Sequence, residues 1–166
     1  MTVPVKITIK EKRPPGVSAR KWRVFTKESW AIVGNYWHEH MLEDHFRPDA
    51  KYRYHYQRRA SKYIAKKLAL AKRGDVEGGG RTDLVFKGDL KEFVTSLAYV
   101  QAFPARAKLV MKAPSYVTSK PKGGRPWMAQ EVSTVLEGEK KKLGKIQKEH
   151  IVNKMNSYSE TKTTTI

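Results

Sequence analysis

The segment FRPDAKYRYHYQRRASKYIAKKLALAKRG, from Phe46 to Gly74, contains the features that decide the fold of this chain. It opens with interleaved tyrosines and arginines and continues as a lysine-rich stretch with apolar residues at helical spacing. A glycine-rich break follows at 75–80, and RTDLVFKGDLKEFVTS occupies 81–96. Apolar residues alternate in this last part, on either side of a glycine, and alternation predicts a strand. We therefore expect an aromatic segment, a basic helix, a loop and a strand in succession.

The basic helix is predicted to run from Ser61 to Arg73, with Gly74 as its stop. Its expected inner face consists of Tyr63, Ile64, Leu68 and Ala71. Between Gln57 and the end of this helix the chain has seven basic residues and no acid: Arg58, Arg59, Lys62, Lys66, Lys67, Lys72 and Arg73. No ion pair within the helix can neutralise them, so we expect them to contact a polyanion or an acidic protein. A solvated face is the other interpretation of such a run.

The whole chain is strongly basic, with 34 lysines and arginines against 16 acids and a formal net charge of +18. Self-repulsion destabilises such a compact chain unless a partner offsets it. The loop at 117–126, rich in glycine and proline, adds Lys120, Lys122 and Arg125 to the contact candidates. Nucleic acid is the first partner expected, and an acidic protein surface is the second. We expect no membrane partner, because no strongly amphipathic basic helix with tryptophan stands out.

Two elements are predicted before this central stretch. VPVKITIK, at 3–10, alternates with the period of a strand and belongs to an N-terminal strand and arm at 1–23. A helix is predicted from Thr26, as its N-cap, to about Asp44. The apolar residues that share its inner face are Trp30, Val33, Trp37 and Met41. This helix is expected to bury a large aromatic surface in the core.

The elements after the central stretch complete a predicted α+β fold. ARAKLVMKAPSYV, at 105–117, predicts a strand, and WMAQEVSTV, at 127–135, fits either a strand or a helix. A last helix is expected after Gly138, and the polar tail at 157–166 is expected to be flexible. We predict a single domain over 1–156, with a small, mainly antiparallel sheet flanked by helices and extended loops.

The sequence contains no recognisable catalytic motif. It has no cysteine, which excludes disulfides, thiolate nucleophiles and cysteine-bound zinc. HEHMLEDH, at 38–45, places its histidines at spacings that do not converge on one helix face, so no metal site is expected. No serine, histidine and aspartate arrangement has a recognisable nucleophile elbow. We therefore expect a protein that is not an enzyme and that has no cofactor.

The segment YRYHYQRR, at 52–59, allows two interpretations. Its rings and arginines could hold single-stranded nucleic acid by base stacking and backbone contacts. They also fit a ladder of buried tyrosines with arginines that point outward. We favour the packed ladder, because stacking platforms lie on open sheet faces or in grooves and the sequence shows neither here.

Several segments between about 30 and 155 recur together in one known family. The first are HFRPDA at 45–50, the tyrosine- and arginine-rich segment, and a KY-x3-K helix with Lys62, Tyr63 and Lys67. The next is a phrase at 84–90 formed by Leu84, Val85, Lys87, Gly88, Asp89 and Leu90, in which a lysine replaces a small polar residue frequent in the family. The last are APSYV at 113–117 and WMAQEVSTVLEGEKKKL at 127–143. Together they resemble the neck and tail-completion proteins of tailed bacteriophages, a virion-morphogenesis, tail-terminator-like family.

This resemblance implies a structural virion protein that forms a ring at the head–tail junction, around the DNA channel. The implied partners are further copies of the chain, in a hexamer, together with adjacent neck, connector and tail-tube proteins and the genomic DNA in the channel. The implied location is the virion, and the host cytoplasm during assembly. The alternative is a basic nucleic-acid-binding protein, either ribosome-associated or a DNA-packaging factor.

Overall fold

The computed structural model describes residues 2–3, 13–76, 84, 89–110, 117 and 127–163. The described helices are α1 (Ala19–His40), α2 (Ala50–Arg53), α3 (Ser61–Ala71), α4 (Asp89–Thr95), α6 (Met128–Val132) and α7 (Glu137–Thr163), with a 3-10 helix η1 (Leu42–Phe46). The described strands are β1 (Thr2–Val3), β2 (Tyr99–Phe103) and β3 (Arg106–Val110). The predicted α+β class is confirmed.

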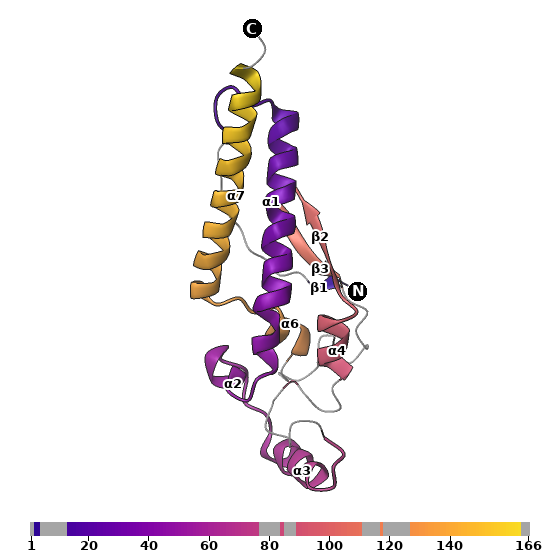
Figure 1. Ribbon diagram of the computed structural model, residues 1–166. Coiled ribbons are helices and arrows are strands. Elements are labelled where there is room, and N and C mark those ends of the chain that lie inside the picture. The colour runs from indigo at the N-terminus through magenta and orange to yellow at the C-terminus, as the bar shows by residue number, and fades with distance from the viewer. Residues whose placement is uncertain are drawn as a thin grey trace.

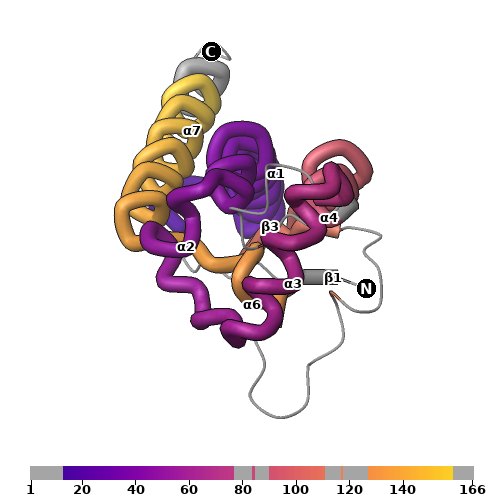
Figure 2. Tube along the Cα trace, turned by 90° about the horizontal axis from the view of Figure 1, so that it is seen from below, coloured from indigo at the N-terminus to yellow at the C-terminus, as the bar shows by residue number. Residues whose placement is uncertain are grey.

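Helix α1 is the central element of the molecule. It packs against α7 on one side and against β2 and β3 on the other, so that α7, α1 and the sheet form successive layers (Figure 1). The sheet has the strand order β1-β3-β2, and both strand pairs are antiparallel, as predicted. The view along α1 places α7 and α4 on opposite sides of this helix (Figure 2).

Helix α1 approaches the sheet closely at a glycine. A Cβ atom on Gly34 would lie 2.5 Å from Cγ1 of Val100 and 3.0 Å from Cβ of Ala107. In the antiparallel register Val100 pairs with Leu109, and Ala102 pairs with Ala107. These side chains pack toward the core beneath α1. Because neighbouring residues of a strand point to opposite faces, the alternate residues of β2 and β3 point away from α1.

Helix α1 begins earlier than predicted. Ser18 is its N-cap, and the N–H of Lys21 donates a hydrogen bond of 3.3 Å to Oγ of Ser18. The predicted cap, Thr26, lies inside the helix, where its hydroxyl donates to the carbonyl of Trp22 at 2.9 Å. Residues 19–23, which the prediction placed in the N-terminal arm, are therefore helical. Alanine, arginine and lysine favour a helix there once a serine cap precedes them.

The predicted apolar face of α1 is confirmed, since Trp30, Val33, Trp37 and Met41 are all buried. The helix ends at His40, four residues before the predicted end at Asp44. The chain then continues as η1, which buries Leu42 and Phe46. The 3-10 helix places both apolar side chains in the core.

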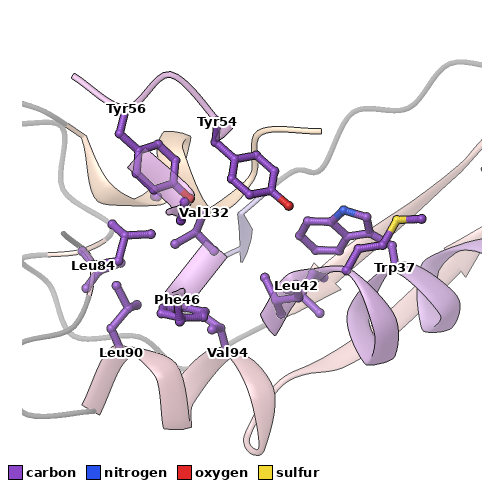
Figure 3. Packing of buried hydrophobic residues seen from close by; sticks show 14 of the residues in the cluster. Trp37, Leu42, Phe46, Tyr54, Tyr56, Leu84, Leu90, Val94 and Val132 are labelled. Atoms are coloured by element: carbon purple, nitrogen blue, oxygen red, sulfur yellow. The ribbon is translucent and has the colours of Figure 1, made fainter. Parts of the chain in front are cut away.

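The residues from Asp89 form a helix, and the strand predicted here is wrong. Within α4, Leu90 and Val94 are one turn apart and both buried. Figure 3 shows the side chains of Leu90 and Val94 pointing toward Phe46 of η1. Helix α4 packs against η1. A short apolar pattern does not distinguish a strand from one turn of helix. The contact with η1 selects the helix.

Helix α7 is longer than predicted and includes part of the expected tail. It continues to Thr163, so residues 157–163, which were predicted to lie in the tail, are helical. The ring of Tyr158 meets that of Phe25 edge-on, with 6.0 Å between the centroids. Because α1 begins at Ala19, its first turns provide the surface on which the end of α7 packs. The ambiguous segment at 127–135 contains the short helix α6.

Several predicted segments lie outside the described residues. They include most of the strand at 3–10, of which Val3 pairs with Leu109. Residues 77–83, 85–88, 111–116 and 118–126 are also outside the described ranges. The strand predicted at 105–117 is confirmed over Arg106–Val110.

Candidate partner-binding surface

Helix α3 carries most of the predicted contact residues. It lies at the opposite end of the molecule from the last turns of α7 (Figure 1). Gly74 has a φ of 82°, and the N–H of Asp75 donates to the carbonyl of Leu70 at 3.1 Å. A glycine in this conformation is a common way to end a helix. The predicted helix and its stop are confirmed, apart from the last two residues of the helix.

Five of the predicted cations are exposed on α3 or beside it: Arg58, Lys62, Lys66, Lys72 and Arg73. Lys62 and Lys66 are about one turn apart and lie on one side of α3, and Arg73 follows the end of the helix at Ala71. Between described residues, no salt bridge involves any of the five. This side of α3 therefore presents positive charge to solvent.

Lys67 does not belong to this surface. Only 3% of Lys67 is exposed, whereas Leu68, which was predicted to face inward, is 43% exposed. The helix is turned so that Tyr63 and Leu70 lie on the protein side together with Lys67. The predicted inner face is wrong at Leu68, and Lys67 is removed from the contact candidates.

Arg59 also turns inward, although the sequence predicted outward arginines. Its Nη1 donates to Oε1 of Glu131 at 2.8 Å, and its Nη2 donates to Oε2 at 2.5 Å. The side chains of Arg59 and Glu131 are 6% and 10% exposed. The N–H of Gln57 donates to the same carboxylate at 3.2 Å. This two-point ion pair fastens the chain before α3 to α6, and the charge of Arg59 is neutralised inside the protein.

The tyrosines between α2 and α3 form a buried stack. The rings of His45 and Tyr54 are stacked with 3.8 Å between centroids, and those of Tyr54 and Tyr56 with 5.9 Å. Figure 3 shows Tyr54 and Tyr56 side by side above the buried apolar residues. Tyr54 and Tyr56 are 3% and 7% exposed, whereas Tyr52 is 76% exposed. The packed ladder is thus confirmed for two of the three tyrosines.

His45 completes this stack and is held neutral. It is fully buried, and its Nδ1 shares a hydrogen bond of 2.5 Å with the hydroxyl of Tyr56. Burial lowers the pKa of His45 to about 4, although the adjacent Asp44 carboxylate acts in the opposite direction. The imidazole is therefore uncharged at physiological pH. It serves packing and is not available to a partner.

A buried carboxylate at the start of α7 holds the other end of the stack. The hydroxyl of Tyr54 donates to Oε1 of Glu139 at 2.7 Å, and the N–H of Leu136 donates to Oε2 at 3.0 Å. Burial, followed by this hydrogen bond, raises the pKa of Tyr54. The rings of Tyr54 and Tyr56, which a base-stacking site would use, therefore already make contacts inside the protein.

The histidines at 38–45 lie in three different environments. Nε2 of His38 shares a hydrogen bond of 2.8 Å with the carbonyl of Val94. His40 is exposed beside Glu39, and His45 is in the core. Among the described residues, no group of three histidines, aspartates or glutamates is placed to hold a metal ion.

The remaining predicted contact residues, Lys120, Lys122 and Arg125, lie outside the described residues and stay predictions. Two cations of β3, Arg106 and Lys108, were not predicted as contact residues. A signal for them is present in the sequence, because the chain has no acidic residue between Glu92 and Glu131. That run includes the whole β2–β3 hairpin.

Among the described strands, β2 lies at an open edge of the sheet. It pairs with β3 on one side, and no other described strand pairs with it. Leu97, just before the strand, is 53% exposed, and Tyr99, its first residue, is 61% exposed. An unpaired strand edge offers its N–H and C=O groups to another chain. The hairpin therefore combines an open edge, exposed apolar side chains and positive charge.

No described helix is both long enough and apolar enough to cross a membrane. Comparison with models of protein families, with curated proteins and with solved structures found no match to this chain.

Proposed function

We propose that this chain is a structural virion protein that forms a ring at the head–tail junction of a tailed bacteriophage, as a neck or tail-completion component around the DNA channel. The observation that carries the proposal is the open edge of β2. An edge strand is a template for a strand of a second copy. A contact between two different surfaces of the same chain, repeated around an axis, closes a ring. The resemblance in sequence supports the place of this ring at the head–tail junction.

The side chains beside the edge favour a protein contact there. Leu97 and Tyr99 are large, exposed and adjacent to the edge. Tyrosine is enriched at protein interfaces, where its ring buries a large area. The edge is also held in place, because Val100 packs beneath α1 at Gly34. A rigid edge loses little conformational freedom when it pairs, which favours association.

The charge of the chain supports partners beyond further copies. Each copy has a net charge of +18, so a ring of copies repels itself unless anionic groups offset it. The exposed cations Lys62 and Lys66 on α3, and Arg73 just after it, are placed to meet such groups. In the proposed assembly these groups are adjacent acidic neck or tail proteins, or the DNA in the channel.

The experiment that tests the ring is native mass spectrometry of the purified protein after nuclease treatment. We expect a closed oligomer, with six copies as the first expectation. The double variant Leu97→Lys/Tyr99→Lys places charge beside the edge of β2, and it should dissociate the oligomer without unfolding the chain. Tyr52→Lys is the matched control, because Tyr52 is an exposed tyrosine on α2.

Two results would contradict the proposal. One is an oligomer that survives the double variant, which would place the interface elsewhere. The other is a wild-type monomer or dimer that copurifies with nucleic acid before nuclease treatment. The second result would favour the alternative function, a basic nucleic-acid-binding protein.

A further inference from the structure

The sheet has one face that is not covered by α1, and we call it the outer face. Its residues are the alternate positions of the hairpin: Tyr99, Gln101, Phe103, Arg106, Lys108 and Val110. Gln101 and Arg106 are exposed, and Tyr99 is 61% exposed. Figure 1 shows the sheet on the side of α1 away from α7. Solvent therefore reaches the polar groups of the outer face.

Two cations of the outer face are held in position by one ring. The guanidinium carbon of Arg106 lies 5.4 Å from the centroid of Phe103, and Nζ of Lys108 lies 5.5 Å from it. Phe103 pairs directly with Arg106 and is diagonal to Lys108 across the hairpin. Cation–π contacts of this kind restrict both side chains on the outer face. Fewer rotamers are then lost when an anion binds.

No acidic side chain in the hairpin competes for these cations. The chain lacks acids from residue 93 to residue 130. Two lysines of α7 differ, because Lys140 lies 3.1 Å from Glu137 and Lys145 lies 3.9 Å from Glu149. The two groups of cations therefore have the same formal charge but different neighbours. Between described residues, no salt bridge involves Arg106 or Lys108, so both can pair with an anion of another molecule.

The phosphate backbone of a nucleic acid fits this face better than its bases do. Base stacking needs successive free rings, and the ring of Phe103 already contacts two cations. Tyr99 is the one exposed ring of the hairpin. Phosphate contacts instead need cations and amide donors, which Arg106, Lys108 and Gln101 provide.

We propose that the outer face binds the phosphate backbone of duplex DNA. This inference rests on the proposed function for its setting, where it assigns the outer face to the wall of the DNA channel. The contact itself depends on the hairpin alone. It is independent of sequence, because phosphates carry no base information.

The test measures binding of a duplex oligonucleotide of random sequence by fluorescence anisotropy at several salt concentrations. Arg106→Gln/Lys108→Gln should make the slope of log K against log salt shallower by about 1.8, at about 0.9 for each lost phosphate contact, which weakens binding about 60-fold near 0.1 M salt. Lys140→Gln/Lys145→Gln is the matched control, since it removes the same charge where acids are adjacent. It should leave the slope unchanged. Circular dichroism melts check that both variants fold.

Three outcomes would overturn the inference. The slope of log K against log salt could be the same in the hairpin variant as in the wild type. The control variant could also lose as much DNA binding as the hairpin variant does. The hairpin variant could also lose binding to polyglutamate and keep binding to duplex DNA, which would make the face a site for acidic protein. Native mass spectrometry of the same variants separates this result from the proposed function. A ring with an unchanged slope refutes the DNA contact alone, and a monomer with the expected slopes refutes the ring alone.

Discussion

The linker at 54–60 and helix α3 adjoin in the sequence and are both basic, but the fold uses their charges differently. In the linker, Arg59 is buried against Glu131, and the rings of Tyr54 and Tyr56 are stacked in the core. In α3, Lys62 and Lys66 are exposed, without a salt bridge to any described residue. The linker places Tyr54, Tyr56 and Arg59 in the core, whereas one side of α3 is a charged surface.

The difference shows what permits a cation to be buried. A buried charge is costly unless a partner of opposite sign and further hydrogen bonds compensate it. Glu131 provides this for Arg59, since its two oxygens match the planar guanidinium. A net charge per segment therefore does not indicate which cations are available to a partner.

The largest expected effect comes from breaking the buried ion pair of the linker. Arg59→Gln leaves the carboxylate of Glu131 without its cation in the protein interior. We expect the free energy of unfolding to fall by about 3–5 kcal/mol, as measured by urea denaturation. Arg58→Gln is the matched control, because Arg58 is adjacent and exposed, and it should change stability by less than about 0.5 kcal/mol. Equal effects of the two variants would show that the buried ion pair contributes no more to stability than an exposed arginine does.

The second prediction concerns the stability of the protein at acidic pH, which depends on the buried His45. Its pKa is lowered to about 4 by burial, so below the ordinary value of 6.5 the unfolded chain binds a proton that the folded chain does not. Stability is therefore lost as the pH falls from about 6.5 toward 4, by roughly 3 kcal/mol at the lower end. The measurement is the unfolding free energy at several pH values.

A pair of variants isolates this contribution from that of other titrating groups. His45→Phe/Tyr56→Phe removes the titrating ring together with the hydroxyl that it bonds, and it keeps the stack. This variant should lose less stability between pH 6.5 and 4 than the wild type does. His55→Gln changes an exposed histidine of the same linker and should keep the wild-type pH dependence. If the two variants depend on pH alike, His45 is not the group responsible.

The third prediction tests the hydrogen bond that ties the linker to α7. Tyr54→Phe keeps the stacked ring but removes the donor to Glu139, which lies in a buried position. We expect a loss of about 1–2 kcal/mol, because one bond of a buried carboxylate is left unmade. Tyr52→Phe makes the same chemical change at a tyrosine that is 76% exposed. A thermal melt that places both variants at the wild-type midpoint would show that this bond contributes nothing.

The smallest expected effect comes from the charged side of α3. Replacing Lys62, Lys66, Lys72 and Arg73 by glutamine keeps the helix propensity nearly unchanged and removes four exposed charges. Stability should change by less than about 0.5 kcal/mol. Lys67→Gln, a single change at the buried lysine of the same helix, should destabilise more than the quadruple variant does. The reverse order in chemical denaturation would contradict the assignment of the two sides of α3.

Parts of the fold followed from local patterns, and parts did not. The apolar stripe of α1, the span of α3 with its stop at Gly74, and strand β3 were predicted, because each depends on spacing and termination signals within a few residues. Helix α4 was mistaken for a strand, since its few apolar residues fit both periods. The first turns of α1 and the last turns of α7 were missed because each is stabilised by the other, through contacts such as Phe25 with Tyr158.

The sequence by itself determined the charge of +18, the lack of cysteine and the absence of acids across the β2–β3 hairpin. These follow from composition, and no fold can change them. Only the tertiary structure decided which cations are exposed and which are buried. Arg59 is buried against a carboxylate 72 residues away, and Lys67 is buried because of the orientation of α3. Arg106 and Lys108 contact the ring of Phe103 on the outer face of the sheet. The reason is that the free energy of a charged group depends on what surrounds it in space, and distant segments provide those surroundings.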